Sequence, residues 1–428
     1  MPRDSQDGLD WRYDLFETVP VWTRQPSISA IENVSRQLLK VPSGDLCRIS
    51  FYASGAFNKL YRVECADRSL IMRVSLPVYP RCKIQGEVAT LTWLQYNTTA
   101  PVPKVVAFND CNDNEIGFEW ILMEFMPGFE AYQKWRAMSM EQKTVFAKRI
   151  ADIQAELFRP VKLDRAFKSI GTLQTNSNGP RIEKSAALSL GPLVTHEFFL
   201  GKRLSYDVPR GPFRSSYAWL EAQLKIIVLE QLAAIEKAED EDDRENAEEI
   251  LLLARRLLSL LPKVFQISGE EDEEPTILWH DDLNLRNILV DDRGEITAIV
   301  DWECVSAMPA WVTTNMPKFL QGENRTEEPI RENYMDETPE DRDESDWDNE
   351  GKNPLYWGHL MEYETTQLRE VYCTRLRQSC PDWPLRHSHT KIDFYEAVIQ
   401  CNAGVFVRKV NKWIDEIESG NVIRWADI

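Results

Sequence analysis

The chain has 428 residues, of which 43% are hydrophobic, 28% charged and 10% aromatic. This composition excludes a disordered or low-complexity protein, and the length suits roughly two or three compact units. The formal net charge of −19 comes from three acidic stretches, residues 236–249, 270–274 and 323–350, and the rest of the chain is near neutral. Acidic segments repel phosphate backbones, so we expect no nucleic-acid partner.

Eight cysteines are scattered along the chain without a Cys-x-x-Cys pair or a zinc-like Cys/His spacing, which favours reduced thiols. The first residues have no apolar run typical of a signal peptide. No apolar stretch approaches the roughly 18 residues that a membrane-spanning helix needs. We therefore expect a cytoplasmic protein that does not contact a membrane, and its oligomeric state is left open.

The apolar pattern divides the chain into three parts. Residues 1–45 contain an amphipathic pattern at 28–41, which predicts an N-terminal helical extension. In residues 46–127, apolar and polar positions alternate with a period of two, interrupted by one helical pattern. This pattern predicts a β-β-β-α-β-β domain. Residues 128–428 are expected to be mainly helical. The expected strands are 46–52, 59–65, 69–74, 101–108 and 118–125, and the expected helices are 85–94, 147–158, 218–238, 248–261, a segment from 360 and 394–417.

The helical part is interrupted by a short strand pattern at 276–279 and by a hairpin pattern with its turn at Arg293-Gly294. The acidic stretch 323–350 has little periodicity, so we expect it to be an insertion.

Chemistry is indicated most clearly by the stretch His280-Asp-Asp-Leu-Asn-Leu-Arg-Asn287, followed by Asp301-Trp-Glu. Asp282 and Asn287 fall on one tight loop between strands, and Asp301 ends the hairpin beside that loop, so three oxygen-bearing side chains can converge. Such oxygens suit Mg²⁺ bound together with substrate phosphates, and a carboxylate suits a hydroxyl nucleophile. The motif therefore predicts phosphoryl transfer.

This pattern resembles the catalytic loop of protein kinases. It is still more similar to the aminoglycoside phosphotransferase family, in particular to fungal members with Trp-Glu after the metal-binding aspartate. The resemblance implies an α+β, protein-kinase-like fold with a small antiparallel-sheet N-lobe (46–127) that carries one helix, and a larger, mainly helical C-lobe (128–428). In that C-lobe it places a catalytic loop at 280–303.

The same resemblance implies a role for each residue of the motif. Asp282 would orient the attacking hydroxyl group and accept its proton, and His280 would anchor the loop. Asn287 and Asp301 would bind Mg²⁺. Glu303 would either reach a second metal or the substrate, or cap a neighbouring turn.

For the nucleotide, the resemblance implies a loop that covers the phosphates, and Ser54-Gly55-Ala-Phe57-Asn58 lies at the expected place. Its single glycine is equally typical of a tight hairpin turn.

The third strand offers Arg73 where kinases have a lysine, and Arg and Lys are not interchangeable where geometry is tight. Glu87 on the following helix is its expected partner, although Lys83, four residues earlier, could pair with Glu87 instead. Glu124 and Met126 fall at the expected hinge, whose backbone would receive the adenine.

These features predict a phosphotransferase that uses ATP and Mg²⁺ to phosphorylate a hydroxyl group of a small molecule. The alternative is a nucleotide-binding pseudokinase or scaffold with little transfer activity, which Arg73 and the single-glycine loop favour. Protein kinase activity is less favoured, because Pro309-Ala-Trp311 does not resemble the Ala-Pro-Glu element of protein kinases. The acceptor, and the choice between ATP and GTP, are left open.

Overall fold

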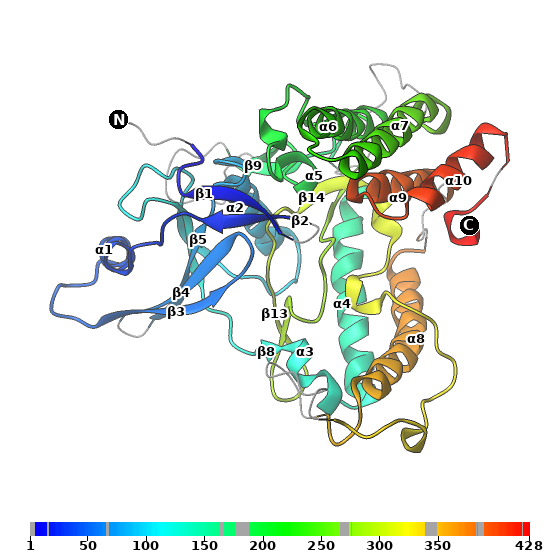
Figure 1. The fold of residues 1–428 in the computed structure, drawn as a ribbon. Coiled ribbons are helices and arrows are strands. Elements are labelled where there is room, and N and C mark those ends of the chain that lie inside the picture. Colours follow the sequence, from blue (N-terminus) through cyan, green and yellow to red (C-terminus); the bar gives the residue numbers. More distant parts are fainter. Residues whose placement is uncertain are drawn as a thin grey trace.

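The structure, a computed structural model, has a small lobe built around an antiparallel sheet and a larger lobe built mainly from helices (Figure 1). This arrangement confirms the expected α+β fold class with its N-lobe and C-lobe. The residues that the structure describes are 5–14, 17–65, 68–162, 167–175, 188–265, 274, 276–338, 349–381, 383, 389–421 and 423–428.

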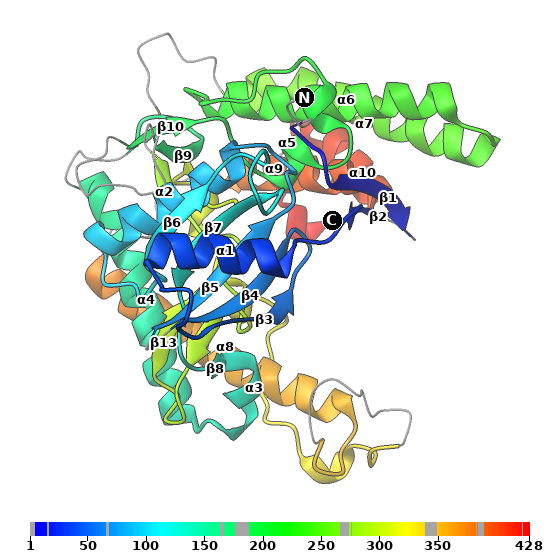
Figure 2. The same ribbon diagram turned by 90° about the vertical axis from the view of Figure 1, so that its left-hand side faces the viewer.

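The N-lobe sheet has the strand order β3-β4-β5-β7-β6, with antiparallel neighbours throughout. Side chains alternate between the two faces of a strand. Ile71 therefore joins the core beneath helix α2 (Cys82–Asn97), whereas Met72 joins the core that contains Ile31 of helix α1 (Ile28–Leu39). Figure 2 shows α1 lying across the sheet. The strands are β3 (Cys47–Ser54), β4 (Asn58–Cys65), β5 (Arg68–Ser75), β6 (Val105–Asn109) and β7 (Glu119–Glu124).

Helices of the C-lobe pack in pairs, α4 on α8, α6 on α7 and α7 on α9. None of the described helices is long and apolar enough to cross a membrane. The helices are α3 (Ala131–Lys134), α4 (Met140–Lys162), α5 (His196–Phe199), α6 (Ser216–Lys237), α7 (Glu241–Val264), α8 (Pro354–Ser379), α9 (His389–Ala403) and α10 (Val407–Glu418). The short strands are β8 (Phe129–Glu130), β9 (Thr172–Thr175), β10 (Leu188–Gly191), β11 (Thr276–Trp279), β12 (Ile288–Val290), β13 (Ile296–Ile299) and β14 (Ser306–Pro309).

Part of the acidic stretch 236–249 forms the start of helix α7. The Asp240 side chain accepts a hydrogen bond of 2.8 Å from the backbone N–H of Asp243 and caps the helix. Acidic residues occupy the first turn of the helix, where they interact favourably with its partial positive charge.

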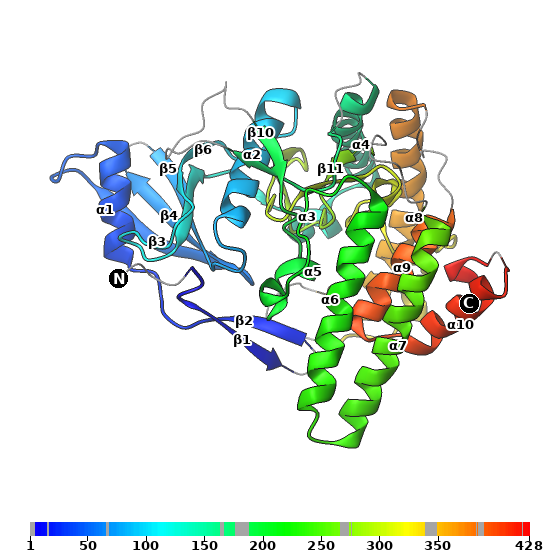
Figure 3. The same cartoon turned by 90° about the horizontal axis from the view of Figure 1, so that it is seen from above.

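The segment 1–45 contains more than the expected helix. A hairpin of β1 (Leu9–Asp14) and β2 (Glu17–Trp22) precedes α1, which corrects the expectation of a purely helical extension. The hairpin is fixed by apolar packing, and the rings of Trp22 and Phe118 lie 4.9 Å apart. Figure 3 shows the hairpin reaching from the N-lobe toward α5 and α6.

The stretch 323–350, expected to be an insertion, lies partly against helix α8. Arg325 forms an ion pair of 3.0 Å with Glu362 of that helix. Arg369, also on α8, donates a hydrogen bond of 3.1 Å to the Glu323 carbonyl oxygen. Residues 339–348 of the expected insertion, and residues 270–273 of the second acidic stretch, lie outside the described residues.

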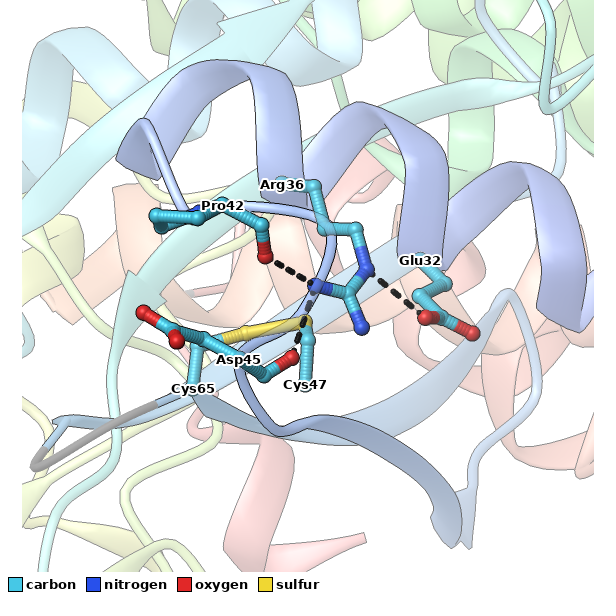
Figure 4. The surroundings of a disulfide bond; sticks show 6 residues. All are labelled: Glu32, Arg36, Pro42, Asp45, Cys47 and Cys65. Carbon is cyan, nitrogen blue, oxygen red and sulfur yellow. Dashed lines mark hydrogen bonds and ion pairs between the residues drawn. A yellow bond between two sulfur atoms is a disulfide. The ribbon is translucent and has the colours of Figure 1, made fainter.

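Cys47 on β3 and Cys65 on β4 are joined by a disulfide bond, which corrects the expectation that all the thiols are reduced. The two residues are paired across the antiparallel strands, with their Cα atoms 4.3 Å apart. Figure 4 shows Arg36 of α1 beside the bond, donating hydrogen bonds of 3.0 Å to the carbonyl oxygens of Pro42 and Asp45. The disulfide thus joins β3 to β4, and Arg36 holds the segment that precedes β3 against α1.

Candidate active site

The loop of residues 280–287 connects β11 to β12, as expected. The Asn284 side chain shapes it, because its Oδ1 accepts hydrogen bonds from the backbone N–H groups of Arg286 (2.8 Å) and Asn287 (3.2 Å). Asn and Asp side chains stabilise tight turns in this way. The loop therefore presents Asp282 and Asn287 from one rigid turn.

The Asp282 carboxylate is held by three side chains of the described residues. Its Oδ1 accepts hydrogen bonds from the Asn284 amide (3.0 Å) and the Lys318 ammonium group (2.9 Å), and its Oδ2 accepts one from the Asn287 amide (3.0 Å). Burial alone would raise the pKa of Asp282, but the hydrogen bonds from Lys318 and Asn284 hold it below its ordinary value. The carboxylate is therefore ionised near neutral pH.

His280 lies where an anchor of the loop is expected. Its ring is buried, and its Nε2 donates to the carbonyl oxygen of Val300 at 3.3 Å. The ring also packs against Trp302, with centroids 4.8 Å apart. Both contacts tie the start of the loop to the strand that ends beside Asp301.

Arg73 on β5 joins the N-lobe to the C-lobe. Its guanidinium forms the expected ion pair with Glu87 of α2 (3.3 Å) and also contacts Asp301 (3.0 Å) and Glu303 (2.7 Å). Burial alone would lower the pKa of Arg73, but the three carboxylates raise it well above its ordinary value. Arg73 is thus a fixed cation at the junction of the lobes.

Glu303 and Lys83 form a second charged group beside Arg73. The Lys83 side chain is 1% exposed, and its ammonium nitrogen lies 2.5 Å from Glu303 and 2.9 Å from the Asn58 side-chain oxygen. The Asn58 amide in turn donates to Glu303 at 2.9 Å. Glu303 therefore accepts hydrogen bonds from Asn58 and forms ion pairs with Arg73 and Lys83, all on the N-lobe. Neither this contact of Lys83 nor that of Asn58 was expected from the sequence pattern.

The two buried carboxylates of this cluster differ in proton affinity. Burial alone would raise the pKa of Glu303, but Arg73 and Lys83 hold it well below its ordinary value. Burial raises the pKa of Glu87 to about 7, although Arg73 and Lys83 oppose that rise. Within the described part of the chain, one Glu87 carboxylate oxygen has no hydrogen-bond partner. Glu303 is therefore the main counter-ion of the two cations.

The loop expected over the nucleotide phosphates forms a tight hairpin turn, closed by a hydrogen bond of 2.9 Å from the Gly55 N–H to the Asn58 carbonyl oxygen. Ser54 and Gly55 are exposed at its tip. Phe57 is buried, with its ring 5.4 Å from that of His196 and 5.6 Å from that of Phe199. The loop is therefore fastened to helix α5 of the C-lobe.

The expected hinge follows strand β7. The Glu124 N–H donates to the Lys104 carbonyl oxygen at 2.9 Å, and the Phe125 N–H donates to the Ser69 carbonyl oxygen at 3.4 Å. Met126 lies just beyond the strand. Glu124 and Phe125 thus use their backbone donors within the sheet, and the chain leaves the sheet at Met126.

Asn287 and Asp301 have the chemistry of Mg²⁺ ligands. The Asn287 amide nitrogen donates to Asp282, and one Asp301 oxygen accepts from Arg73. The Asn287 amide oxygen and the second Asp301 oxygen accept no hydrogen bond from any residue that the structure describes. Mg²⁺ takes one or two protein oxygens together with substrate phosphates. The described residues contain no cluster of three or more His, Cys, Asp or Glu side chains that could hold a metal ion.

The two-lobe fold, with a charged cluster at the junction and a His-Asp-Asp loop below it, defines a kinase-like protein. The model of the phosphotransferase enzyme family (APH) matches residues 48–312, and the chain belongs to this family. This confirms the family expected from the sequence motif.

Individual relatives are more distant. A subtelomeric hrmA-associated cluster protein of Aspergillus fumigatus is 25% identical to this chain. The match covers 63% of this chain and 60% of that protein's length. The altered inheritance of mitochondria protein 9 of Meyerozyma guilliermondii is 25% identical over 64% of this chain and half of its own length. The structure of aminoglycoside phosphotransferase APH(4)-Ia is 11% identical, with a TM-score of 0.43 over 92% of this chain and all of that one.

The relatives contradict the expected cytoplasmic location. The altered inheritance of mitochondria proteins 9 of Meyerozyma guilliermondii, Yarrowia lipolytica and Debaryomyces hansenii are all named as mitochondrial. The cytoplasmic assignment rested on the absence of a targeting pattern at the start of the sequence, and these names overturn it.

Proposed function

We propose that this protein transfers the γ-phosphoryl group of ATP, with Mg²⁺, to a hydroxyl group of a small-molecule acceptor. The observation that carries the proposal is the Asp282 carboxylate, ionised and held by Asn284, Asn287 and Lys318. A carboxylate held in this way can orient a hydroxyl group for attack, which is the main requirement of phosphoryl transfer. Membership of the phosphotransferase enzyme family supports the same reaction.

In the proposed step, the acceptor oxygen forms a bond to the γ-phosphorus while the bond from that phosphorus to the departing ADP oxygen breaks. The hydroxyl proton passes to Asp282 and then to solvent. The products are ADP and a phosphate monoester of the acceptor. Because the pKa of Asp282 is lowered, the carboxylate is a weak base, and orienting the hydroxyl is its main contribution.

The remaining site residues would bind and align the nucleotide. Asn287 and Asp301 are the residues that would hold Mg²⁺, which neutralises phosphate charge when it is bound. Arg73 keeps Asp301 in place through its 3.0 Å ion pair. Ser54, Gly55, Phe57 and Asn58 would cover the phosphates, and the backbone near Glu124 and Met126 would receive the adenine.

One observation favours the alternative, a nucleotide-binding pseudokinase or scaffold. Arg73 shares its guanidinium among Glu87, Asp301 and Glu303, and its side chain is 7% exposed. A cation compensated in this way attracts phosphate less strongly than a free one. In this alternative, the cluster would serve to hold the two lobes together.

Measurement of ADP formation separates the two functions. The protein is incubated with ATP, Mg²⁺ and a panel of sugars and amino alcohols, beside the Asp282→Asn variant and an Asp292→Asn control on the exposed hairpin turn. We expect Asp282→Asn to lower turnover about a thousandfold without weakening ATP binding, and Asp292→Asn to leave turnover unchanged. Equal turnover of wild type and Asp282→Asn would contradict the proposed mechanism.

A further inference from the structure

The Asp282 carboxylate has a partner outside its own loop, Lys318, which no part of the sequence motif contains. We propose that Lys318 is a positioning residue for phosphoryl transfer, which fixes the orientation of the Asp282 carboxylate toward the acceptor hydroxyl. This inference rests on the proposed function. It assigns to Lys318 an effect on transfer that acts through Asp282 rather than through nucleotide binding.

The backbone that carries Lys318 is anchored beside the catalytic loop. The following residue, Phe319, donates its N–H to the carbonyl oxygen of Leu283 at 3.2 Å. Leu283 is the residue directly after Asp282 in the loop. The Phe319 ring packs against Phe146, with centroids 5.4 Å apart. Leu320 is fully buried, and its carbonyl oxygen accepts a hydrogen bond of 2.6 Å from Arg369. These contacts hold the Lys318 side chain next to the carboxylate.

The hydrogen bonds of Asp282 indicate what Lys318 contributes. An ionised carboxylate has about four positions that accept a hydrogen bond. Among the described residues, Asn284 and Lys318 occupy both positions of Oδ1, and Asn287 occupies one position of Oδ2. The second position of Oδ2 is therefore the one that an acceptor hydroxyl can use.

Stability alone does not require this ion pair. The Lys318 side chain is 51% exposed and that of Asp282 is 44% exposed. Ion pairs at such exposure contribute about 0–1 kcal/mol to the free energy of unfolding. A charge-assisted hydrogen bond is nevertheless stronger and shorter than a neutral one, so Lys318 limits the rotation of the carboxylate more than the two amides alone.

The test compares Lys318→Met, Lys318→Arg and a matched control, Lys225→Met. Lys225 is 48% exposed and forms an ion pair of 3.0 Å with Glu221 on α6. ADP formation is measured with ATP and Mg²⁺ across the same panel of sugars and amino alcohols. We expect Lys318→Met to lower kcat about tenfold or more with an unchanged KM for ATP, Lys318→Arg to recover most of that loss, and Lys225→Met to have no effect.

A second measurement places the effect at Asp282. Lys318→Met is combined with Asp282→Asn, and residual turnover is compared with that of Asp282→Asn alone. We expect no further loss, because a residue that acts through Asp282 has no effect once the carboxylate is gone. A further loss in the double variant, an increased KM for ATP or an unchanged kcat in Lys318→Met would overturn the inference.

The outcomes also separate this inference from the proposed function. If Asp282→Asn abolishes turnover while Lys318→Met behaves as wild type, the phosphotransferase proposal stands and the role of Lys318 falls. If wild type and Asp282→Asn both fail to consume ATP, the proposed function falls, and the role of Lys318 falls with it.

Discussion

The Arg73 guanidinium on the N-lobe lies 3.0 Å from the Asp301 carboxylate on the C-lobe, 228 positions later in the chain. The same guanidinium contacts Glu87 and Glu303. One arginine thus links the central strand, the helix beside it and the segment that follows the catalytic loop. Together with the contacts of Lys83 and Asn58 to Glu303, this side chain holds the three segments next to one another.

Replacing Arg73 therefore affects stability as well as activity. Removing one partner of a buried ion pair typically lowers the free energy of unfolding by about 3–5 kcal/mol, and we expect a loss of this size for Arg73→Met. Arg73→Lys keeps the charge but has one nitrogen to share among three carboxylates, so we expect an intermediate loss. Urea unfolding measures both, with Arg68→Met on the exposed part of the same strand as the control.

The outcome for Arg73→Lys is the more informative one. A stability equal to that of wild type would show that the charge alone matters and that the bridging geometry does not. If one guanidinium bridges all three carboxylates, lysine must be less stabilising than arginine at this position.

Lys83 and Glu303 are expected to be energetically coupled, because their charged groups lie 2.5 Å apart and are mostly buried. Each single variant, Lys83→Met or Glu303→Gln, removes one partner of a charged group in the cluster and should lower the free energy of unfolding by about 3 kcal/mol. The loss of unfolding free energy in the double variant should be smaller than the sum of the two single losses, by about 0.5–3 kcal/mol. Losses that add up in a urea double-mutant cycle would contradict a direct interaction.

Glu119 gives the protein a predictable pH dependence outside the candidate site. Burial raises its pKa from 4.5 to about 8, although the Arg81 N–H donates to it at 2.7 Å. Between these two pH values the unfolded chain has released a proton that the folded protein retains. The unfolded state then binds fewer protons, so the free energy of unfolding falls as pH rises through this window.

The Glu119→Gln variant tests this sign. The amide does not titrate, so the variant should gain stability relative to wild type as pH rises from 4.5 to 8, with each unit of pKa shift worth about 1.4 kcal/mol. Urea unfolding at the two ends of the window measures the difference, with the exposed Glu115→Gln as the control. An equal pH dependence of wild type and Glu119→Gln would show that Glu119 ionises normally in the fold.

The part of the site that lies in one contiguous motif could be predicted from sequence. Asp282, Asn287 and Asp301 fall within the loop and hairpin that the period-two pattern already places side by side. The Arg73–Glu87 pair was expected from the resemblance to kinases, in which a cation of the third strand pairs with a glutamate of the following helix, and the structure contains it. The roles of these residues in binding Mg²⁺ and the nucleotide stay predictions.

Long-range contacts could not be read in the same way. Lys318 lies 36 positions after Asp282, on a short turn without periodicity, and long-range contacts of Phe319 and Leu320 bring it back to the loop. Lys83 has the spacing of an exposed helical partner of Glu87, yet it lies buried against Glu303. The Cys47–Cys65 bond depends on which residues of β3 and β4 face each other, and the sequence pattern does not specify that register.

Phosphorus NMR of the reaction products tests transfer to a hydroxyl acceptor most directly. Wild type, Asp282→Asn and Asp292→Asn are each incubated with ATP, Mg²⁺ and the panel of hydroxyl compounds. We predict a new phosphate monoester signal, together with ADP, for wild type and Asp292→Asn and none for Asp282→Asn. ADP with only inorganic phosphate, or the same monoester signal from Asp282→Asn, would contradict transfer to a hydroxyl acceptor at this site.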